Sequence, residues 1–310
     1  MRVTTAVVDS PYIHTEQLRH FLLFDVLPLL TVLSLPLYYR YIYAGWFEVG
    51  LLILFWLITG LGITVGYHRL FTHHSFEAAR PLQAFLAVTA GMAAQGGVTS
   101  WAAIHRFHHE QSDKPGDLHS PNLHGHEWFN RARGLFHSHF WWMSRHSYPN
   151  VVRYVPDILR NPLLSKINRY YHYWIVLGLL VPAALGALYH RDLRGAISGF
   201  LWGGVFRIFV VEQIIWGVNS ICHMFGTRPY ETRENSRNMG ILAILTLGEC
   251  WHNNHHRFVS SPNFGLHWYK LDPGYWFIRL MQIFGFAWDL RVPHAAQIAN
   301  RDAEPLVQAR

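Results

Sequence analysis

The sequence predicts an all-α integral membrane protein with four transmembrane helices in two hairpins and a cytoplasmic helical cap holding a histidine-bound di-metal site. Three observations lead to this prediction. First, the 310 residues are 51% hydrophobic and only 15% charged, whereas soluble domains carry about 25% charged residues. Second, four apolar stretches are long enough to cross a bilayer as helices, which takes about 20 residues. Third, the chain has 22 histidines, more than its 19 Asp and Glu residues combined.

The same composition excludes several classes of protein. The mean hydropathy of +0.08 shows that part of the chain must face water. The two cysteines, Cys222 and Cys250, are too few for a disulfide scaffold or a sulfur-ligated metal site. The net charge of +7 could suit nucleic acid, but the basic residues form no continuous stripe. A cytoplasmic membrane surface fits this charge better, so we expect the bilayer and not nucleic acid as a partner.

The four apolar stretches come in two pairs. We expect the spans at about 21–39, 46–65, 173–189 and 197–215. A short link joins the two members of each pair, which is the pattern of two membrane hairpins. The first stretch contains Asp25, Pro28 and Pro36, and the fourth contains Arg207. A polar segment of some twenty residues precedes the first stretch, so no cleavable signal peptide is expected.

The distribution of Lys and Arg predicts the orientation. Residues 67–170 hold eleven of them and the tail from Cys222 onward holds nine, so both segments and both termini are placed in the cytoplasm. A fifth apolar stretch, 82–104, is rich in Gly and Ala. We interpret it as re-entrant or interfacial, because a span here would put histidines on opposite sides of the membrane. With no internal repeat, 1–310 is expected to be one domain with catalytic segments 67–170 and 222–293.

Three dense histidine clusters flank the apolar segments. They are His68 and His73; His105, His108 and His109; and His252, His255 and His256. In the second and third clusters, spacings of three and four residues put the imidazoles on one helical face, where they can converge on one or two metal ions. The pair in the first cluster lies about 140° apart on an ideal helix, so it needs a helix end or two different metals.

The number of histidines favours a two-metal site. Eight imidazoles packed together without a metal would leave many buried donors and acceptors to satisfy. A structural zinc ion takes four ligands, so these are too many for one such ion. Imidazole suits zinc, copper, iron and nickel alike, and ligand type therefore leaves the metal open. Isolated histidines are interpreted as interfacial or hydrogen-bonded side chains, namely His14, His20, His190 and His294.

The order and spacing of the segments HRLFTH, HRFHH and HNNHH resemble the membrane-bound fatty acid desaturases of the stearoyl (delta-9) type. The resemblance covers about Leu51 to Pro293 and includes Asn219-Ser-Ile-Cys-His223 and Gly248-Glu249. It implies an oxygen-dependent enzyme that introduces a cis double bond, at the delta-9 position, into a saturated fatty acyl chain. The chain would be carried on CoA or on a membrane lipid.

The resemblance also implies a set of site residues. Two iron ions would be held by nine histidines, with Asn219 acting through a bound water. The nine are His68, His73, His105, His108, His109, His223, His252, His255 and His256. Three residues match positions that line the acyl tunnel of the family, namely Gln95, Trp101 and Trp216.

Other polar residues near the clusters receive different roles. His74 has no counterpart in the family and is not expected to bind metal. His137 and His139 are interpreted as structural or substrate-lining. Candidates to orient the histidine rings from behind are Glu110, Asp113 and Asp117, because ligating imidazoles commonly donate their second N–H to a carboxylate.

The resemblance implies partners as well. With no haem-binding module recognised in the sequence, we expect electrons from a separate protein, a ferredoxin, that docks on the basic cytoplasmic face. Animal acyl-CoA desaturases carry charged residues directly before the second histidine segment to contact CoA. Here those positions are Ala103 and Ile104, which have no charge to contact CoA, so an acyl-lipid is a candidate substrate. The sequence after the third segment resembles bacterial members, so the expected location is a bacterial inner membrane.

Two alternatives remain open. One is a membrane di-iron alkane or lipid hydroxylase of the same histidine-box superfamily, in which similar metals rebind oxygen instead of removing a second hydrogen. The other is a metal transporter. A transporter needs ionisable residues inside its spans, whereas the histidine clusters lie outside the predicted ones, which disfavours this second alternative.

Overall fold

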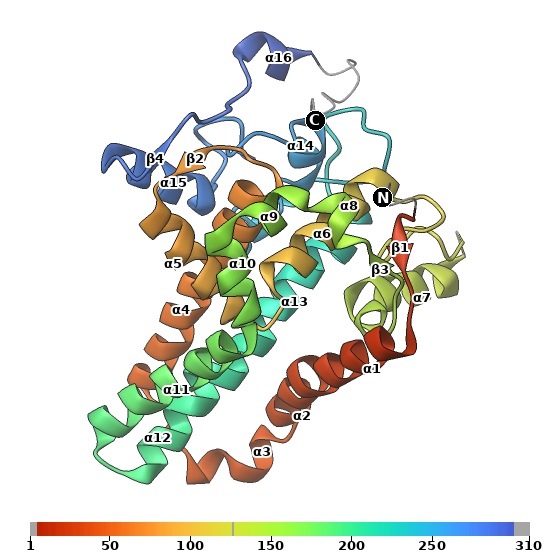
Figure 1. The fold of residues 1–310 in the computed structure, drawn as a ribbon. Coiled ribbons are helices and arrows are strands. Elements are labelled where there is room, and N and C mark those ends of the chain that lie inside the picture. Colours follow the sequence, from red (N-terminus) through yellow and green to blue (C-terminus); the bar gives the residue numbers. More distant parts are fainter. Residues whose placement is uncertain (1–4, 126, 301–310) are drawn as a thin grey trace.

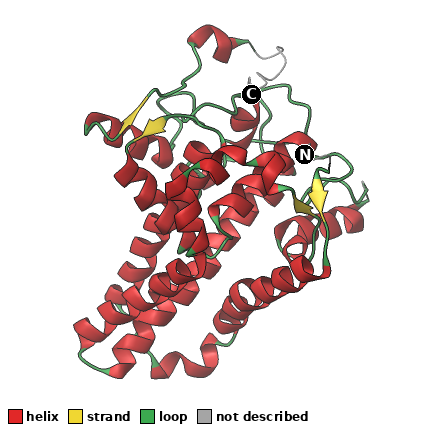
Figure 2. Ribbon diagram, in the orientation of Figure 1, coloured by secondary structure: helices red, strands yellow, loops and turns green. Residues whose placement is uncertain are grey.

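The computed structural model describes residues 5–125 and 127–300 (Figure 1). Helices dominate, and the strands are confined to two short ribbons (Figure 2). In one ribbon, β1 (Val7–Val8) pairs antiparallel with β3 (Tyr148–Pro149). In the other, β2 (Glu77–Ala78) pairs antiparallel with β4 (Ala287–Trp288). The ribbons thus join the N-terminal segment to the middle of the chain, and the segment after the first histidine cluster to the C-terminal region.

Three of the four predicted spans correspond to helices long and apolar enough to cross a membrane. The first joins α4 (Trp46–Leu61) to the π-helix η3 (Gly62–Thr72), the second is α11 (Tyr171–His190), and the third joins α12 (Leu193–Gly199), the π-helix η5 (Phe200–Phe206), α13 (Arg207–Ser220) and η6 (Ile221–His223). Two of these helices run further than predicted. They extend to Thr72 and His223, so part of the histidine set lies on the ends of the long helices themselves.

The first predicted span is not one straight helix. It comprises α1 (Pro11–His20), the π-helix η1 (Phe21–Val26), α2 (Leu27–Leu33), α3 (Leu35–Tyr38) and η2 (Tyr39–Tyr41). The helix breaks at Ser34, and the two parts meet at a bend of 59°. Pro36 explains the break, because it has no N–H for the carbonyl of Val32 and its ring clashes with that carbonyl. The described residues contain a fourth candidate span only if these two parts are counted as one.

The apolar stretch 82–104 forms two helices, as expected for a segment that does not span. They are α5 (Arg80–Gly91) and α6 (Val98–Gln111), separated by a turn. The 12 residues of α5 are about 18 Å long, well short of a bilayer core of about 30 Å. A side chain at Gly62 would collide with the backbone of Thr89 and Ala90, so the glycine allows α5 to pack closely on η3.

Short helices and loops gather at one end of the long helices. In chain order these are α7 (Trp128–His139), η4 (Trp141–Ser144), α8 (Val151–Tyr154), α9 (Pro156–Arg160), α10 (Pro162–Arg169), η7 (Gly240–Leu242), α14 (His252–Arg257), α15 (Pro273–Ile283) and α16 (Ala295–Ala299). Figure 1 shows α14 at this end and the connection between α11 and α12 at the other. The main core, which includes Ile63, Leu86 and Ala102, packs η3, α5 and α6 together and supports the histidines.

Candidate metal centre

The π-helix η3 explains the geometry of the first histidine pair. The His73 N–H donates to the carbonyl of His68 at 3.1 Å, five residues back, which is the hydrogen bond of a π-helix. Its wider turn brings residues five apart onto one side, and the two ring centroids are 4.8 Å apart. The pair therefore belongs to one group at a helix end, and two different metals are not needed.

The second and third clusters each divide between two groups of histidines. In α6, His105 and His109 share one group and His108 joins the other; in α14, His252 and His256 share one group and His255 joins the other. The first group is His68, His73, His105, His109 and His255, and the second is His108, His223, His252 and His256. Within each group the candidate ligand atoms lie within 4.8 Å of one another. The structure thus brings together all nine predicted histidines, five in one group and four in the other.

The nitrogen atoms in each group are spaced as ligands of one metal ion. In the first group the Nε2 atoms of successive rings are 3.0 to 3.1 Å apart, through His73, His105, His109, His255 and His68. For metal–nitrogen bonds of about 2.1 Å, ligands at right angles would be about 3.0 Å apart.

The second group repeats this spacing. The Nε2 atom of His252 lies 3.0 Å from that of His223 and 3.1 Å from that of His256.

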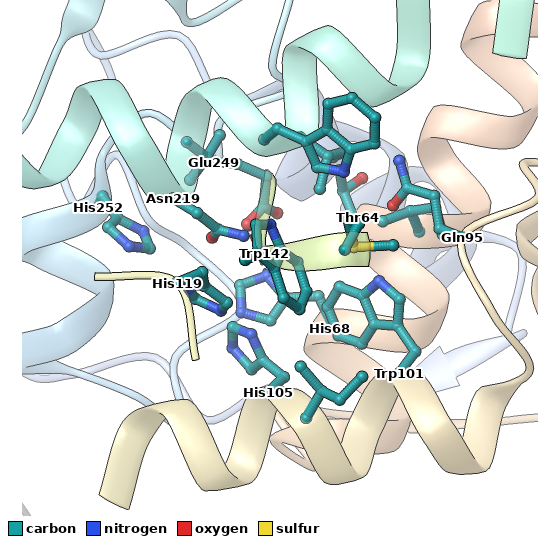
Figure 3. A pocket seen from close by; sticks show the side chains of 16 residues that line it. Thr64, His68, Gln95, Trp101, His105, His119, Trp142, Asn219, Glu249 and His252 are labelled. Atoms are coloured by element: carbon teal, nitrogen blue, oxygen red, sulfur yellow. Dashed lines mark ion pairs between the residues drawn. The ribbon is translucent and has the colours of Figure 1, made fainter. Parts of the chain in front are cut away.

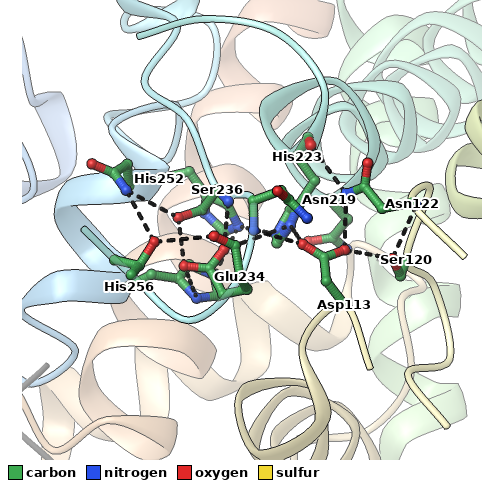
Figure 4. A network of polar contacts seen from close by, with 12 residues as sticks. Asp113, Ser120, Asn122, Asn219, His223, Glu234, Ser236, His252 and His256 are labelled. Carbon is green, nitrogen blue, oxygen red and sulfur yellow. Dashed lines mark hydrogen bonds and ion pairs between the residues drawn. The ribbon is translucent and has the colours of Figure 1, made fainter. Parts of the chain in front are cut away.

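Carboxylates behind the rings indicate which nitrogen carries the proton. Four rings have a carboxylate oxygen beside Nδ1: His68 with Glu249 at 2.6 Å, His108 with Asp117 at 3.1 Å, His223 with Asp113 at 3.2 Å and His256 with Glu234 at 3.6 Å. Figure 4 shows the last two of these pairs. A ring that donates from Nδ1 presents the lone pair of Nε2 to the other rings. Converging lone pairs repel unless a cation lies between them. The buried Nε2 of His108 has no hydrogen-bond partner among the described residues. The donor set therefore fits two metal ions.

Burial favours the neutral, metal-binding form of imidazoles that have no carboxylate partner. Burial, together with the neighbouring imidazoles, lowers the pKa values of His105, His109 and His255 well below the usual range. The carboxyl groups behind the other rings are instead stabilised in their charged form. Burial alone would raise the pKa of Asp113 and Asp117, but the hydrogen bonds and charges of His223 and His108 hold both values well below their usual range. Four carboxylates against two divalent ions would balance in charge.

The carboxylates were only partly predicted. Asp113 and Asp117 lie behind the rings as expected, but Glu110 does not; it is exposed and pairs with Arg153 at 3.2 Å. Glu110 follows His109 directly on α6, so its side chain points away from the ring cluster. Glu234 and Glu249 were missed as partners of the rings, because they lie far from the rings in sequence or outside any recognisable spacing.

A buried arginine holds Glu249 in place. Arg69 is fully buried and contacts Glu249 at 3.3 Å and Asp272 at 2.9 Å. Gly248 has φ of +96°, and a side chain there would collide with the Asp272 carboxylate. The glycine before Glu249 is thus required by the turn that aims this carboxylate at His68.

The predicted tunnel residues border one cavity beside the histidines. Gln95 comes from the turn before α6, Trp101 from α6 and Asn219 from α13 (Figure 3). Trp216 also comes from α13. They share the cavity with His68, His105, His119, His252, Trp142 and Met143, among others. The Nε2 of Gln95 is buried without a partner among the described residues, so one amide donor is available to a ligand. His119, Trp142 and Met143 were not predicted, since no motif marks them.

The remaining predicted positions lie away from the two groups. The His74 side chain is half exposed and contacts Asp157 at 3.0 Å. His139 uses both ring nitrogens, toward Ser220 at 2.9 Å and Gln213 at 3.0 Å. The Nε2 of His137 lies 3.2 Å from the carbonyl oxygen of Leu118.

The two positions before the second histidine segment also have defined places. Ala103 is fully buried and Ile104 lines the cavity, so in this chain both belong to the interior and not to an aqueous surface.

Comparisons with known proteins agree on one family. The model of the fatty acid desaturase family matches residues 44–282. The chain is 44% identical to the hex-5-enoyl-(acyl-carrier protein) acetylenase of Moorena producens, over 94% of this chain and 91% of the relative. It is 38% identical to an sn-1 stearoyl-lipid 9-desaturase of Anabaena variabilis, over 82% and 87%. It is 34% identical to delta-9 acyl-lipid desaturase 2 of Arabidopsis thaliana, over 82% and 78%.

Proposed function

The chain belongs to the fatty acid desaturase family and is an oxidoreductase, and we propose that it introduces a cis double bond at the delta-9 position of a saturated fatty acyl chain. The acyl carrier would be a membrane lipid or CoA. The observation that carries this proposal is the pair of histidine groups beside a cavity that combines aromatic walls with one available amide donor. The relatives that act on stearoyl-lipid or acyl-lipid by name support it, and the hydroxylase alternative is not favoured.

The nine histidines are proposed to hold two iron ions, with Asn219 acting through a bound water. When bound, iron supplies the oxygen activation needed to remove hydrogen from an unactivated methylene. The overall reaction takes O2, two electrons and two protons and yields the alkene and two waters. The neutral rings donate their lone pairs, and Asp113, Asp117, Glu234 and Glu249 hold the rings in orientation from behind.

The cavity residues position the acyl chain. Trp101, Trp216 and Ile104 offer apolar surface to its methylenes and exclude water. The free amide of Gln95 is suited to donate to an oxygen of the acyl group. Rigid positioning is required, because a shift of one methylene would move the double bond along the chain.

A second candidate reaction follows from one comparison. The relative at 44% identity is named as an acetylenase of a hex-5-enoyl chain on acyl-carrier protein. The same chemistry applied to a chain that already has a double bond would yield a triple bond. We therefore keep the acetylenase reaction, with an unsaturated acyl substrate, as the alternative to be separated by product analysis.

The partners and the location are proposed from the sequence pattern. Electrons would come from a separate donor, a ferredoxin, attracted by the basic residues. The chain would act as one domain in a bacterial inner membrane, with its termini and the metal centre on the cytoplasmic side.

Gas chromatography with mass spectrometry of cellular fatty acids tests the function. Cells would express the chain with a ferredoxin, beside matched cells that express His255→Ala or His74→Ala. We expect a new monounsaturated acid with the chain and with His74→Ala, and none with His255→Ala. A new acetylenic acid would support the alternative reaction. A hydroxy acid, or full activity in His255→Ala, would contradict the proposal.

A further inference from the structure

A row of aromatic side chains leads from the cavity wall to the outside of the molecule. Trp216, in the wall, packs edge-on against Phe140 with ring centroids 5.7 Å apart. Phe140 contacts Phe21 at 5.1 Å, and Phe21 contacts Trp141 at 6.4 Å. Phe21 is 5% exposed, whereas Trp141 is 54% exposed. Two rings, Phe140 and Phe21, thus stand between the cavity wall and the surface.

This row follows the seam between the first helical arm, 11–41, and the segment α7–η4. The arm is weakly held for a helix of this length. Of the described side chains in α1, η1, α2 and α3, only Phe21, Asp25 and Pro28 are buried. An element with so few buried contacts opens at lower cost than the rest of a fold.

Polar contacts attach the arm on both sides of the row. Gln17 donates to the carbonyl of His146 at 3.1 Å, and the Nε2 of His20 lies 3.0 Å from the Tyr171 hydroxyl. Deeper along the arm, Asp25 is buried where η1 contacts α13. These contacts fix the resting position of the arm without filling the seam with interlocked apolar side chains.

The outer surface beside the seam suits a lipid headgroup and its chain. Phe129 and Phe136 of α7 are exposed. Arg131, Arg133 and Arg145 are exposed beside them. A short helix with exposed aromatic and cationic side chains lies at a membrane interface and attracts anionic lipid.

We propose that the acyl chain of an anionic membrane glycerolipid enters the cavity sideways from the bilayer, through the seam between η1 and α7. Phe21 and Phe140 act as the gate, and the arginines of α7 and Arg145 hold the headgroup. This inference rests on the proposed function and deepens it, because it makes the substrate a lipid-linked chain. A chain presented from water by CoA or acyl-carrier protein would not need this route.

The experiment staples the arm without touching the gate. Gln17→Cys with His146→Cys places two thiols across the upper end of the seam, to be joined by a short bifunctional methanethiosulfonate, whose disulfide links a reductant can cleave. The native Cys222 and Cys250 are fully buried. The matched control is Phe47→Cys with Tyr189→Cys, whose rings stack at 3.9 Å between α4 and α11, far from the seam. Mass spectrometry of the linked peptides verifies each staple.

The readout is photolabelling, which needs neither iron nor turnover. Protein in vesicles would receive phosphatidylglycerol with a diazirine in its acyl chain, and labelled peptides would be mapped. We expect label at Trp142–Met143 and Ile215–Trp216 in the unlinked protein, a loss of about tenfold when the staple closes, and recovery on reduction. The control staple should change nothing.

Three results would overturn the lateral route. One is equal cavity labelling with the staple closed and open, and another is no cavity labelling from lipid in the unlinked protein. The third is labelling by a diazirine acyl chain on acyl-carrier protein that matches the lipid and ignores the staple, which would assign an aqueous entrance. Because labelling is independent of catalysis, a failure of the proposed desaturation would show separately, as an absence of product with labelling intact.

Discussion

Two buried polar regions of this molecule differ in the partners that their buried groups have. In the candidate metal centre, the rings of nine histidines converge and carboxylates lie behind four of them. Inside the long helices, Arg207 and Glu212 are fully buried and Asp25 nearly so. Arg207 donates to the carbonyls of Met92 at 2.6 Å and Gly178 at 3.0 Å. The first region needs an added cation, whereas the second supplies its own.

The difference distinguishes a binding site from a structural contact. Arg207 lies in this region with Asp25 and Glu212, and its guanidinium is bound by backbone carbonyls. Ionisable groups inside a membrane face the interior of the helix bundle and are bound by partners of this kind. A transporter was disfavoured from the sequence because the histidine clusters lie outside the predicted spans. In the structure, His68 and His223 lie at the ends of spans. The cluster of Asp25, Arg207 and Glu212 lies inside the spans. Since the cluster contains no imidazole and Arg207 is bound by carbonyls, it fits helix packing and not an ion path.

The largest expected effect is the loss of a histidine from either group. We expect His105→Ala and His252→Ala each to lower desaturation by at least about a hundredfold, because each removes a ligand at the middle of its group. Product analysis and iron content per chain measure the effect. Normal iron content with full activity in either variant would contradict the assignment of the two groups.

Metal removal should separate the two regions directly. A chelator should abolish activity and lower the melting temperature, because an ion that binds only the folded state stabilises it. In Glu212→Leu, by contrast, iron content should be unchanged. Purified protein is expected to hold two irons per chain; equal stability with and without metal would contradict a centre that depends on its cations.

Breaking the second region should act on stability alone. Glu212→Leu removes a fully buried carboxyl group that interacts electrostatically with Arg207, with an expected loss of about 3 kcal/mol in the free energy of unfolding. Glu212→Gln keeps the size and polarity of the side chain and should cost less. Denaturation of the detergent-solubilised variants measures both. Equal losses in the two variants would contradict a stabilising role for a polar side chain at this position.

A smaller effect is expected from the carboxylates behind the rings. Glu249→Gln keeps a hydrogen-bonding oxygen for His68 but removes the charge, and should lower iron affinity or activity by about tenfold. Glu110→Gln is the matched control, because this carboxylate is exposed and faces Arg153. Similar iron retention in both variants would argue against a role for the charge of Glu249.

The smallest effect should come from His74→Ala. It removes an exposed contact with Asp157, which Arg106 continues to bind at 2.7 Å. We expect unchanged activity and a stability change below about 0.5 kcal/mol. A lost iron in this variant would mean that the first group extends beyond the residues assigned to it.

The sequence by itself determined the apolar helices and the eight clustered histidines, because both are local patterns, whereas His223 was implied only by the family resemblance. Apolar length and ring spacing depend on residues within a few positions of each other, so they can be predicted without a fold. The bend at Ser34 and the π-helix that joins His68 to His73 are also local, but they depart from the regular helix on which the spacing argument relied.

Only the tertiary structure decided how the rings divide into two groups and which carboxylates support them. His68 and His255 meet across 187 positions, and His223 and Asp113 across 110. Asp25 of η1 and Glu212 of α13 likewise lie on different helices that contact each other. Contacts of this kind follow from how helices pack, and no spacing along the chain encodes them.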